Sequence, residues 1–316
     1  MQLIEVKEKV EKLSENIKKV IIGKDDTIRL MIAAMFAGGH ILLEDVPGSG
    51  KTMLAKTLAK SVDGDFKRIQ MTPDLLPSDI TGINYFDMKT NEFRFIKGPA
   101  FTNILIADEI NRANPKTQSG LLECMEERQI TVDGSTYKLD DVFMVVATEN
   151  PVDSQGVFKL PEAQLDRFLM KLYMEYPSHE DMTKILKVHT ESEVLDDIKP
   201  VMTIDEIKEI AKMVKNVKVD ECLYEYVANI VERTRNHEDV ILGISQRGGI
   251  ALVKAAKSVA LMSGRDYVIP DDIKACAPEV LSHRMLLKNS QRIRKNGEKE
   301  VILSILDEVE VPTEPI

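Results

Sequence analysis

The stretch GGHILLEDVPGSGKT, residues 38–52, decides how this chain folds. Within it, HILLE (40–44) is a short apolar run, and DVPGSGKT (45–52) follows with two glycines before a lysine and a threonine. Residues 51–62 then resume the apolar spacing of a helix. Strand, glycine-rich turn and helix in this order form a unit whose backbone amides surround phosphate oxygens. The sequence therefore predicts a phosphate-binding loop between a buried strand and a helix.

The residues of this loop have distinct expected roles. Gly48 and Gly50 let backbone amides close around phosphate oxygens. Lys51 is expected to reach the β- and γ-phosphates, and Thr52 to offer its hydroxyl to Mg²⁺. Asp45 stands at the first position of the general pattern GxxxxGK[ST], in place of glycine. The expected cofactors are ATP and Mg²⁺, and the expected contacts are Asp45, Val46, Pro47, Gly48, Ser49, Gly50, Lys51 and Thr52.

Two further apolar runs end in side chains suited to hydrolysis. ILIADE (104–109) ends in Asp108, which can hold Mg²⁺ through water, and Glu109, which can polarise an attacking water. This adjacent pair of carboxylates favours ATP hydrolysis. VFMVVATENP (142–151) carries Asn150 where the carboxyl ends of parallel strands line a ligand crevice. An Asn-Pro pair alone is only a turn signal. Asn150 is a candidate catalytic residue because this strand follows the other two motifs in the chain.

Alternation of strand and helix patterns predicts an α/β fold with a parallel sheet flanked by helices. Runs at 103–107 and 142–147 indicate buried strands, with a helix at 115–127 between them. Residues 83–96 and 128–139 alternate around turn residues and predict two β-hairpins inserted beside the sheet. Such hairpins could touch a substrate.

The strand patterns stop after about residue 177. We expect residues 1–177 to form a nucleotide-binding core, and residues 178–316 a smaller all-α lid with a C-terminal tail. The tail beyond about residue 286 is expected to be solvated and partly frayed. The remaining predicted helices are at 4–19, 25–37, 179–189, 204–215, 220–236, 247–263 and 271–284.

Composition narrows the class of protein. The 316 residues include 42 Lys and Arg against 52 Asp and Glu, a formal net charge of −10, which argues against broad binding to nucleic acid. No run of about 18 apolar residues is free of charge, and the first 16 residues are an amphipathic pattern instead of a signal peptide. We therefore expect a cytoplasmic protein without membrane insertion, whose partners are proteins.

The motifs in their order resemble the MoxR family of AAA+ ATPases, in the branch with an insertion in helix 2 and a hairpin before sensor 1. Besides GGHILLEDVPGSGKT and VVATENP (145–151), the matching segments are QMTPDLLPSDITG (70–82), ADEINRANPKTQSGLLECMEE (107–127), LPEAQLDRF (160–168), GISQRGG (243–249) and SGRDYVIPDDI (263–273). They extend over nearly the whole chain. The resemblance implies a P-loop AAA+ core with a helical lid, Asp108 and Glu109 as the Walker B pair, and Asn150 as sensor 1.

The resemblance also implies two arginine roles. Arg167, in LDRF, resembles the arginine finger that serves the nucleotide of the neighbouring subunit, and Arg247 resembles the sensor 2 arginine of the lid. A guanidinium suits both roles because its planar fork matches phosphate oxygens. Two departures from the family pattern are Glu149, where Gln is usual, and Gln246, where Pro precedes the sensor 2 arginine.

Several positions keep two interpretations. Residues 20–23, with Ile22 and Gly23 as the contacts, either stack on adenine, as the resemblance implies, or pack at a helix break. Arg112 and the pair His283-Arg284 recur in the family pattern and are either interface or packing residues.

The leading hypothesis for function is an ATP-driven remodelling or chaperone-like enzyme. The resemblance implies a homo-oligomer, expected to be a hexameric ring, and a protein client, with a von Willebrand factor A domain protein as a partner. One alternative is a nucleic-acid motor related to helix-2-insert helicases, which the acidic total disfavours. Another is a scaffold that binds nucleotide without hydrolysis, which Glu109 disfavours.

Overall fold

A five-stranded parallel sheet forms the centre of the computed structural model, which describes residues 1–44, 48–149, 157–191, 195–288 and 297–312. Its strand order is β2-β5-β8-β1-β9, so the strand before the glycine-rich loop lies inside the sheet. The strands are β1 (Ile41–Glu44), β2 (Phe66–Gln70), β5 (Ile104–Asp108), β8 (Met144–Glu149) and β9 (Met170–Tyr173). The predicted α/β class is confirmed.

The sheet is covered on both faces, because alternate residues of each strand point to opposite sides. Ile41 and Leu43 of β1 join one apolar cluster, and Leu42 joins the other. The first cluster includes helices α1 (Leu3–Lys18), α2 (Asp25–Phe36) and α3 (Lys51–Ser61), and the second includes α4 (Pro77–Thr81) and α5 (Pro115–Glu127). Burial on two faces explains why the three central strands β1, β5 and β8 are nearly continuous apolar runs.

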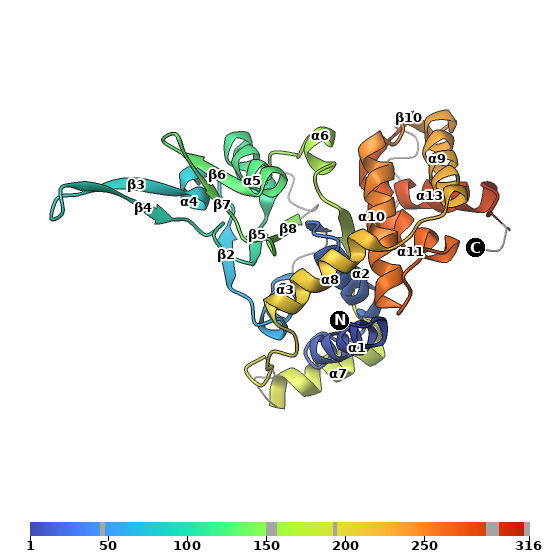
Figure 1. Ribbon diagram of the computed structural model, residues 1–316, viewed down its shortest axis with the longest axis horizontal. Coiled ribbons are helices and arrows are strands. Elements are labelled where there is room, and N and C mark those ends of the chain that lie inside the picture. The colour runs from blue at the N-terminus through green and yellow to red at the C-terminus, as the bar shows by residue number, and fades with distance from the viewer. Residues whose placement is uncertain (45–47, 150–156, 192–194, 289–296, 313–316) are drawn as a thin grey trace.

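Two antiparallel hairpins stand apart from the sheet, and the first projects far from the body (Figure 1). The first joins β3 (Gly82–Asp87) to β4 (Glu92–Lys97), and the second joins β6 (Gln129–Val132) to β7 (Ser135–Lys138). Phe95 of β4 stacks on Tyr137 of β7 with ring centroids 4.2 Å apart. Asn84 Nδ2 donates to Asp133 Oδ2 at 2.9 Å. The base of the first hairpin therefore contacts the second hairpin both at its strand β7 and at its turn, which carries Asp133.

Helices make up most of the chain after β9, with one further short helix, α6 (Glu162–Leu165), before that strand. The helix α10 packs on α2, and Ser258 Oγ donates to Ala33 O at 2.8 Å. The lid thus shares the first apolar cluster with the N-terminal helices. The division near residue 177 stays a prediction. The helices are α7 (His179–Glu191), α8 (Ile204–Asn216), α9 (Glu221–Asn236), α10 (Gln246–Met262), α11 (Pro270–Leu281) and α13 (Gly297–Glu308).

Two local predictions were wrong, and one strand was missed. The tail is not simply frayed, because α13 buries Ile302 and Ile305 against α9 and α11. The lid contains one small ribbon, β10 (Val240–Leu242) with β11 (Leu286–Leu287), whose segments are too short to show a period. The strand β2 was missed because FKRIQ is mostly polar at a sheet edge. In the described part of the chain, no helix has the length and apolarity to span a bilayer.

Candidate functional site

Three neighbouring strands end together beside the glycine-rich loop. We call this end of the sheet the carboxyl edge; it carries Glu44 of β1, Asp108 of β5 and Glu149 of β8. The register pairs Glu44 with Glu149, so β1 and β8 end level with one another. Helix α3 begins at Lys51 and therefore points its amino end at this edge. Ligands of open parallel sheets bind in this position.

The described part of the loop has the shape of a phosphate cradle. Gly48 and Gly50 have φ of +84° and +91°, a region that glycine enters without steric cost. No described atom lies within 4 Å of where a Cβ would stand at either glycine. Residues 45–47, which include Asp45, Val46 and Pro47, lie outside the described residues. The glycines therefore leave the backbone open to a ligand.

Two side chains of this loop suit phosphate oxygens. Lys51 Nζ donates to the backbone oxygen of Glu149 at 3.2 Å, which holds the ammonium group at the carboxyl edge. Ser49 Oγ is buried and has no hydrogen-bond partner among the described residues. A buried hydroxyl without a partner is costly, and a phosphate oxygen would satisfy it. The loop thus fits the nucleotide that its motif predicts.

Asp108 is the centre of a small polar network. Thr52 Oγ1 donates to Asp108 Oδ2 at 3.2 Å, and Thr148 Oγ1 donates to Asp108 Oδ1 at 2.9 Å. Arg68 Nε also donates to Asp108 Oδ2, at 2.8 Å. The structure brings Thr52 and Asp108 together as the motif predicts, and a hydroxyl beside a carboxylate is the oxygen set that Mg²⁺ prefers.

Glu109 stands in a strained backbone conformation next to this network. Its φ and ψ are +58° and +55°, the left-handed region, which costs a non-glycine residue about 1–3 kcal/mol. Its amide donates to Thr148 Oγ1 at 2.8 Å, and its Oε2 accepts from Gln70 Nε2 at 2.8 Å. Arg112 Nε lies 3.3 Å from the same Oε2. Arg112, whose role the sequence left open, therefore lies beside the carboxylate that the sequence predicts as the second of the Walker B pair.

Sequence reasoning missed Arg68 and Gln70, because it missed the strand that carries them. They are two residues apart on β2 and therefore share one face of that strand. β2 pairs with β5 in a register that places Gln70 opposite Asp108. Recognition of a polar edge strand before QMTPDLL would have been the signal.

Glu149 is the last residue of β8 in the described structure, and Asn150 lies outside the described residues. Burial raises the pKa of Glu149 above its usual range, while Lys171 opposes that shift and Glu44 adds to it. Lys171 itself forms an ion pair with Glu44. The Glu149 carboxylate therefore lies between a basic and an acidic side chain, whose effects on its pKa oppose one another.

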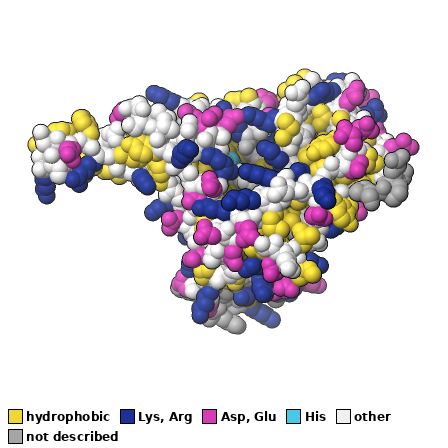
Figure 2. All heavy atoms as spheres, in the orientation of Figure 1, with side chains coloured by type: hydrophobic (Ala, Val, Ile, Leu, Met, Phe, Trp, Pro, Cys, Tyr) yellow, Lys and Arg dark blue, Asp and Glu magenta, His cyan; other side chains and the backbone are white. Residues whose placement is uncertain are grey.

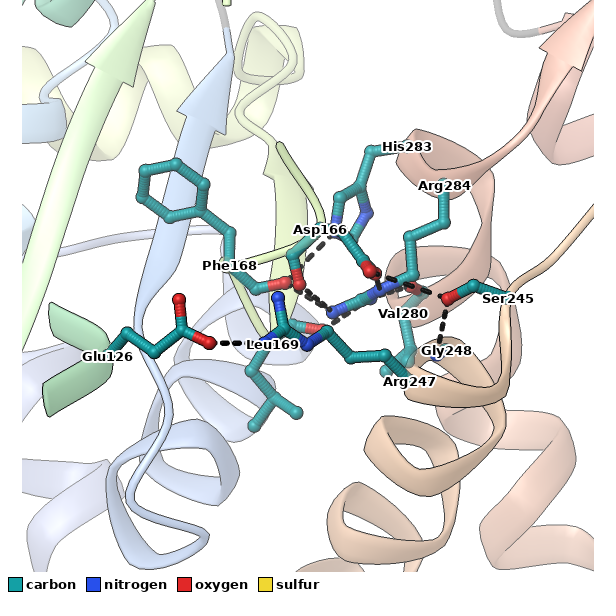
Figure 3. A network of polar contacts seen from close by, with 10 residues as sticks. All are labelled: Glu126, Asp166, Phe168, Leu169, Ser245, Arg247, Gly248, Val280, His283 and Arg284. Atoms are coloured by element: carbon teal, nitrogen blue, oxygen red, sulfur yellow. Dashed lines mark hydrogen bonds and ion pairs between the residues drawn. The ribbon is translucent and has the colours of Figure 1, made fainter. Parts of the chain in front are cut away.

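Arg167 and Arg247 lie together, apart from the carboxyl edge. Arg167 precedes β9, whose first residue Met170 is in register with Ile41, the first residue of β1. Arg167 is thus at the amino edge, where the parallel strands begin. The Nε of Arg167 lies 2.9 Å from Glu126 Oε2. Arg247 pairs with the other oxygen of the same carboxylate, as Figure 3 shows. The structure therefore groups the two arginines with one another.

A buried arginine of the lid anchors the segment that carries Arg167. Arg284 Nε donates to Asp166 Oδ1 at 2.7 Å, and Nη1 donates to the oxygen of Leu169 at 3.1 Å (Figure 3). His283 Nε2 lies 3.0 Å from the oxygen of Phe168, and burial lowers its pKa well below the usual value. Both lid side chains are buried within the subunit, so they pack against the core.

Comparisons with known proteins identify the family of this chain. Residues 40–170 match the model of the ATPase family associated with various cellular activities (AAA), and residues 232–303 match the AAA lid domain. Chaperone MoxR1 of Mycobacterium tuberculosis (strain ATCC 25618 / H37Rv) is 38% identical over 94% of this chain and 80% of its own length. The chain belongs to the MoxR family of AAA+ ATPases.

Other relatives of this MoxR-family chain cover it almost completely. The uncharacterized protein YeaC of Bacillus subtilis (strain 168) is 49% identical over 96% of this chain and 95% of its own length. A solved structure of a candidate ATPase from Cytophaga hutchinsonii has a TM-score of 0.91 and 36% identity, and the match covers 98% of this chain and 97% of that chain. The fold of this chain is therefore shared with that solved structure over nearly its whole length.

Residues 20–23, the segment predicted to contact adenine, lie beside helix α7 of this MoxR-family chain. Val20 and Ile21 are buried in the first apolar cluster, whereas Ile22 is half-buried and Gly23 is exposed. Gly23 has φ of +70°, and a Cβ there would stand 2.4 Å from the carboxylate of Asp181 in α7. The two interpretations thus divide along the segment: its first half packs, and its second half is accessible.

Proposed function

We propose that this chain is an ATP-hydrolysing remodelling enzyme, chaperone-like in its action on protein clients, whose site is completed by a neighbouring copy. The proposal takes residues 1–177 as the core and 178–316 as the lid. One observation carries it: the phosphate-loop residues lie at the carboxyl edge of the sheet, and Arg167 with Arg247 lie at the amino edge.

Within one copy, each side chain at the carboxyl edge has a proposed part. Lys51 and the amides around Gly48 and Gly50 bind the phosphates, and the Ser49 hydroxyl adds a further donor. Thr52 and Asp108 hold Mg²⁺, which supplies charge neutralisation at the phosphates when bound. The motif adds Asp45, Val46 and Pro47 to the cradle, and Asn150 as a γ-phosphate sensor.

Glu109 is the proposed general base. Gln70 and Arg112 hold its carboxylate, so it can orient and polarise an attacking water without searching many rotamers. The strained backbone at Glu109 is tied by the hydrogen bond from its amide to Thr148. Strain kept in place by its surroundings at such a position is consistent with a catalytic role.

Arg167 is proposed to act on the nucleotide of another copy. β9 runs from Met170 to Tyr173, so the two edges are about 10–13 Å apart at a rise of roughly 3.3 Å per residue. Arg167 therefore lies at the opposite end of the strand from a phosphate bound at the carboxyl edge of the same copy. A head-to-tail contact between different surfaces closes into a ring when its rotation allows, and we propose a hexameric ring.

Glu126 is proposed to hold both arginines when no neighbouring phosphate is present. All three side chains are partly exposed, and ion pairs of this kind contribute only about 0–1 kcal/mol. A nucleotide phosphate, with more charge than a carboxylate, can therefore displace Glu126 easily. Arg284 keeps the segment of Arg167 fixed to the lid, so lid rotation would move the finger.

The client contact is proposed for the paired hairpins. β3–β4 exposes Phe86, Met88 and Phe93, and its base is stacked on β6–β7. Helix α5 begins soon after Glu109 and ends just before β6, so it connects the Walker B segment to the hairpins. The name Chaperone MoxR1 of a relative supports a protein client, and we propose a von Willebrand factor A domain protein as a partner in the cytoplasm.

The decisive experiment replaces Glu109 with Gln in the full-length protein. We expect ATP to bind with unchanged affinity while turnover falls by roughly 10²–10⁴-fold, because the general base is lost. The Glu109→Gln variant with ATP should retain more client in a pull-down than the parent protein does. Turnover equal to that of the parent protein would refute the role of Glu109, and salt-sensitive stimulation by single-stranded DNA would favour a nucleic-acid motor instead.

A further inference from the structure

A large groove lies between the lid helices and the amino edge of the sheet. Its volume is about 1220 Å³, and helices α8, α9 and α10 form most of its walls. The core contributes residues 36–38 before β1, together with Arg128 and Val142. Because the phosphate loop follows the other end of β1, this groove is separate from the nucleotide site.

The floor of the groove is apolar and partly open to solvent. Side chains such as Val227, Val231 and Val253 form it, and Phe36 closes its core side. Ile250 is 57% exposed, although it is a large aliphatic side chain on a lid helix. Tyr224 is similarly exposed at 44%. An apolar floor of this kind is typical of a surface that another apolar side chain covers.

The rim of the groove is basic, although the chain as a whole is acidic. Seven Lys and Arg line it against two acidic residues, Asp141 and Glu232, while the whole chain has 42 basic and 52 acidic residues. Figure 2 shows Lys and Arg side chains gathered across the middle of this face, over α8 and beside it. The basic lining residues are Arg128, Lys208, Lys212, Lys215, Arg235, Lys254 and Lys257.

Part of this positive charge is not neutralised within the subunit. Lys208 pairs with Asp140 at 3.1 Å, and Arg128 donates to the backbone oxygens of Gly38 and Asp141. Among the described residues, by contrast, Lys212 and Lys254 form no ion pair. Like charges facing one another across an apolar floor favour a partner that carries acidic groups.

We propose that this groove binds an acidic amphipathic helix of a protein partner. Helix-in-groove recognition places one apolar face on a floor of aliphatic side chains, and here the flanking acids would meet Lys212 on α8 and Lys254 on α10. Nucleic acid fits less well, because unpaired bases stack on aromatic side chains and this floor is mainly aliphatic. The inference is independent of the nucleotide chemistry proposed above.

The test uses a labelled synthetic peptide of about 18 residues, roughly 27 Å long as a helix, with Leu at i, i+3, i+4 and i+7 and Glu on the flanks. Fluorescence anisotropy with the full-length protein measures its affinity. We expect it to bind at least about tenfold more tightly than a peptide of the same composition whose apolar stripe is scrambled. Equal binding of the two peptides would overturn the proposal.

Paired charge reversals locate the binding. Lys212→Glu with Lys254→Glu should lower the affinity for the peptide by about tenfold or more, because two attractive charges become repulsive. Lys12→Glu with Lys187→Glu makes the same change in net charge at exposed positions outside both the groove and the hairpins, and should leave the affinity within about twofold. Circular dichroism of both variants verifies folding. Equal weakening by the two pairs would overturn the proposal.

Two further outcomes would identify a different occupant. Competition by single-stranded DNA of about 20 nucleotides that is abolished by the groove reversals would mean that the groove is a nucleic-acid site. Loss of oligomer mass in light scattering for the groove pair, and not for the control pair, would mean that a second copy of this chain fills the groove. Either result would refute the acidic helix as its occupant.

Discussion

Arg167 Nε lies 2.9 Å from Glu126 Oε2 of the same subunit, at the edge of the sheet opposite the phosphate loop. The same carboxylate binds Arg247, so two arginines from core and lid share one acidic anchor. A single anchor keeps both guanidinium groups on one surface, where an adjoining copy could present a nucleotide. The proposed active site is therefore divided between two copies.

Arg167→Ala should reduce ATP turnover by about 10³–10⁵-fold, because an arginine finger stabilises charge on the transferred phosphate. Nucleotide binding, measured with a fluorescent ATP analogue, should be nearly unchanged. Arg233→Ala is the matched control, since Arg233 forms an exposed ion pair with Glu308 on the lid. Turnover that falls equally in the control would contradict a specific role for Arg167.

Mixing Arg167→Ala with Lys51→Ala subunits should restore part of the turnover. Each variant lacks one half of the site, and a mixed interface can combine an intact loop with an intact finger. Turnover of the mixture is compared with each variant alone at the same total concentration. If light scattering shows co-assembly and no activity returns, Arg167 does not act between copies.

Gln70→Ala should lower kcat more than it changes KM. The Gln70 amide donates to Glu109 Oε2 at 2.8 Å, and its loss leaves the carboxylate less well oriented without removing a phosphate contact. We expect a smaller loss than for Glu109→Gln, roughly tenfold. Gln70→Glu, which cannot donate to a carboxylate, should not restore the rate; a rate equal to the parent protein in either variant would exclude this positioning role.

Gly23→Ala should weaken ATP binding more than it weakens the fold. The Cβ of the new alanine would stand 2.4 Å from the carboxylate of Asp181 and would collide with it. The alanine backbone would also have to keep the φ of +70° that Gly23 has. Gly134→Ala is the matched control, because Gly134 has φ of +80° and no atom of the described residues lies within 4 Å of where its Cβ would stand. Both changes carry a backbone strain of about 1–2 kcal/mol. A KM for ATP that rises only in the Gly23 variant supports the adenine contact, and equal values in both variants contradict it.

Stability should decrease as pH falls below about 6.5, because His40 is buried as the neutral form. Its Nδ1 accepts from the amide of Val145 at 2.9 Å, and its Nε2 lies 3.0 Å from the oxygen of Met125. Burial lowers the pKa of His40 to about 4. Between about pH 4 and pH 6.5, the unfolded chain therefore binds more protons than the folded chain. The folded state is more stable by about 3 kcal/mol above pH 6.5 than below pH 4, as far as His40 is concerned.

Urea unfolding at several pH values between about 7.5 and 5 measures this loss of stability. His40→Asn removes the titrating ring and should reduce the slope of unfolding free energy against pH. His283, whose pKa is also lowered by burial, should leave a residual slope. An unchanged slope in the His40 variant would contradict the assignment.

The sequence by itself determined the elements and motifs that depend on local order. The apolar run before Gly48, the carboxylates that end at Glu109, and the hairpin around Asp133-Gly134 are all readable because period, turn chemistry and chain order are local properties. The parallel sheet followed from alternation alone. The segments that escaped detection, β2 and the β10–β11 ribbon, are polar or too short to carry a period.

Only the tertiary structure decided which distant side chains meet. Nothing in the sequence places Arg68 on Asp108, or Gln70 on Glu109, because strand register is decided by packing across the sheet. The division of the arginines from the phosphate loop has the same cause. Parallel strands have two unlike edges, and the connection that returns to start β9 leaves Arg167 at the edge opposite Lys51.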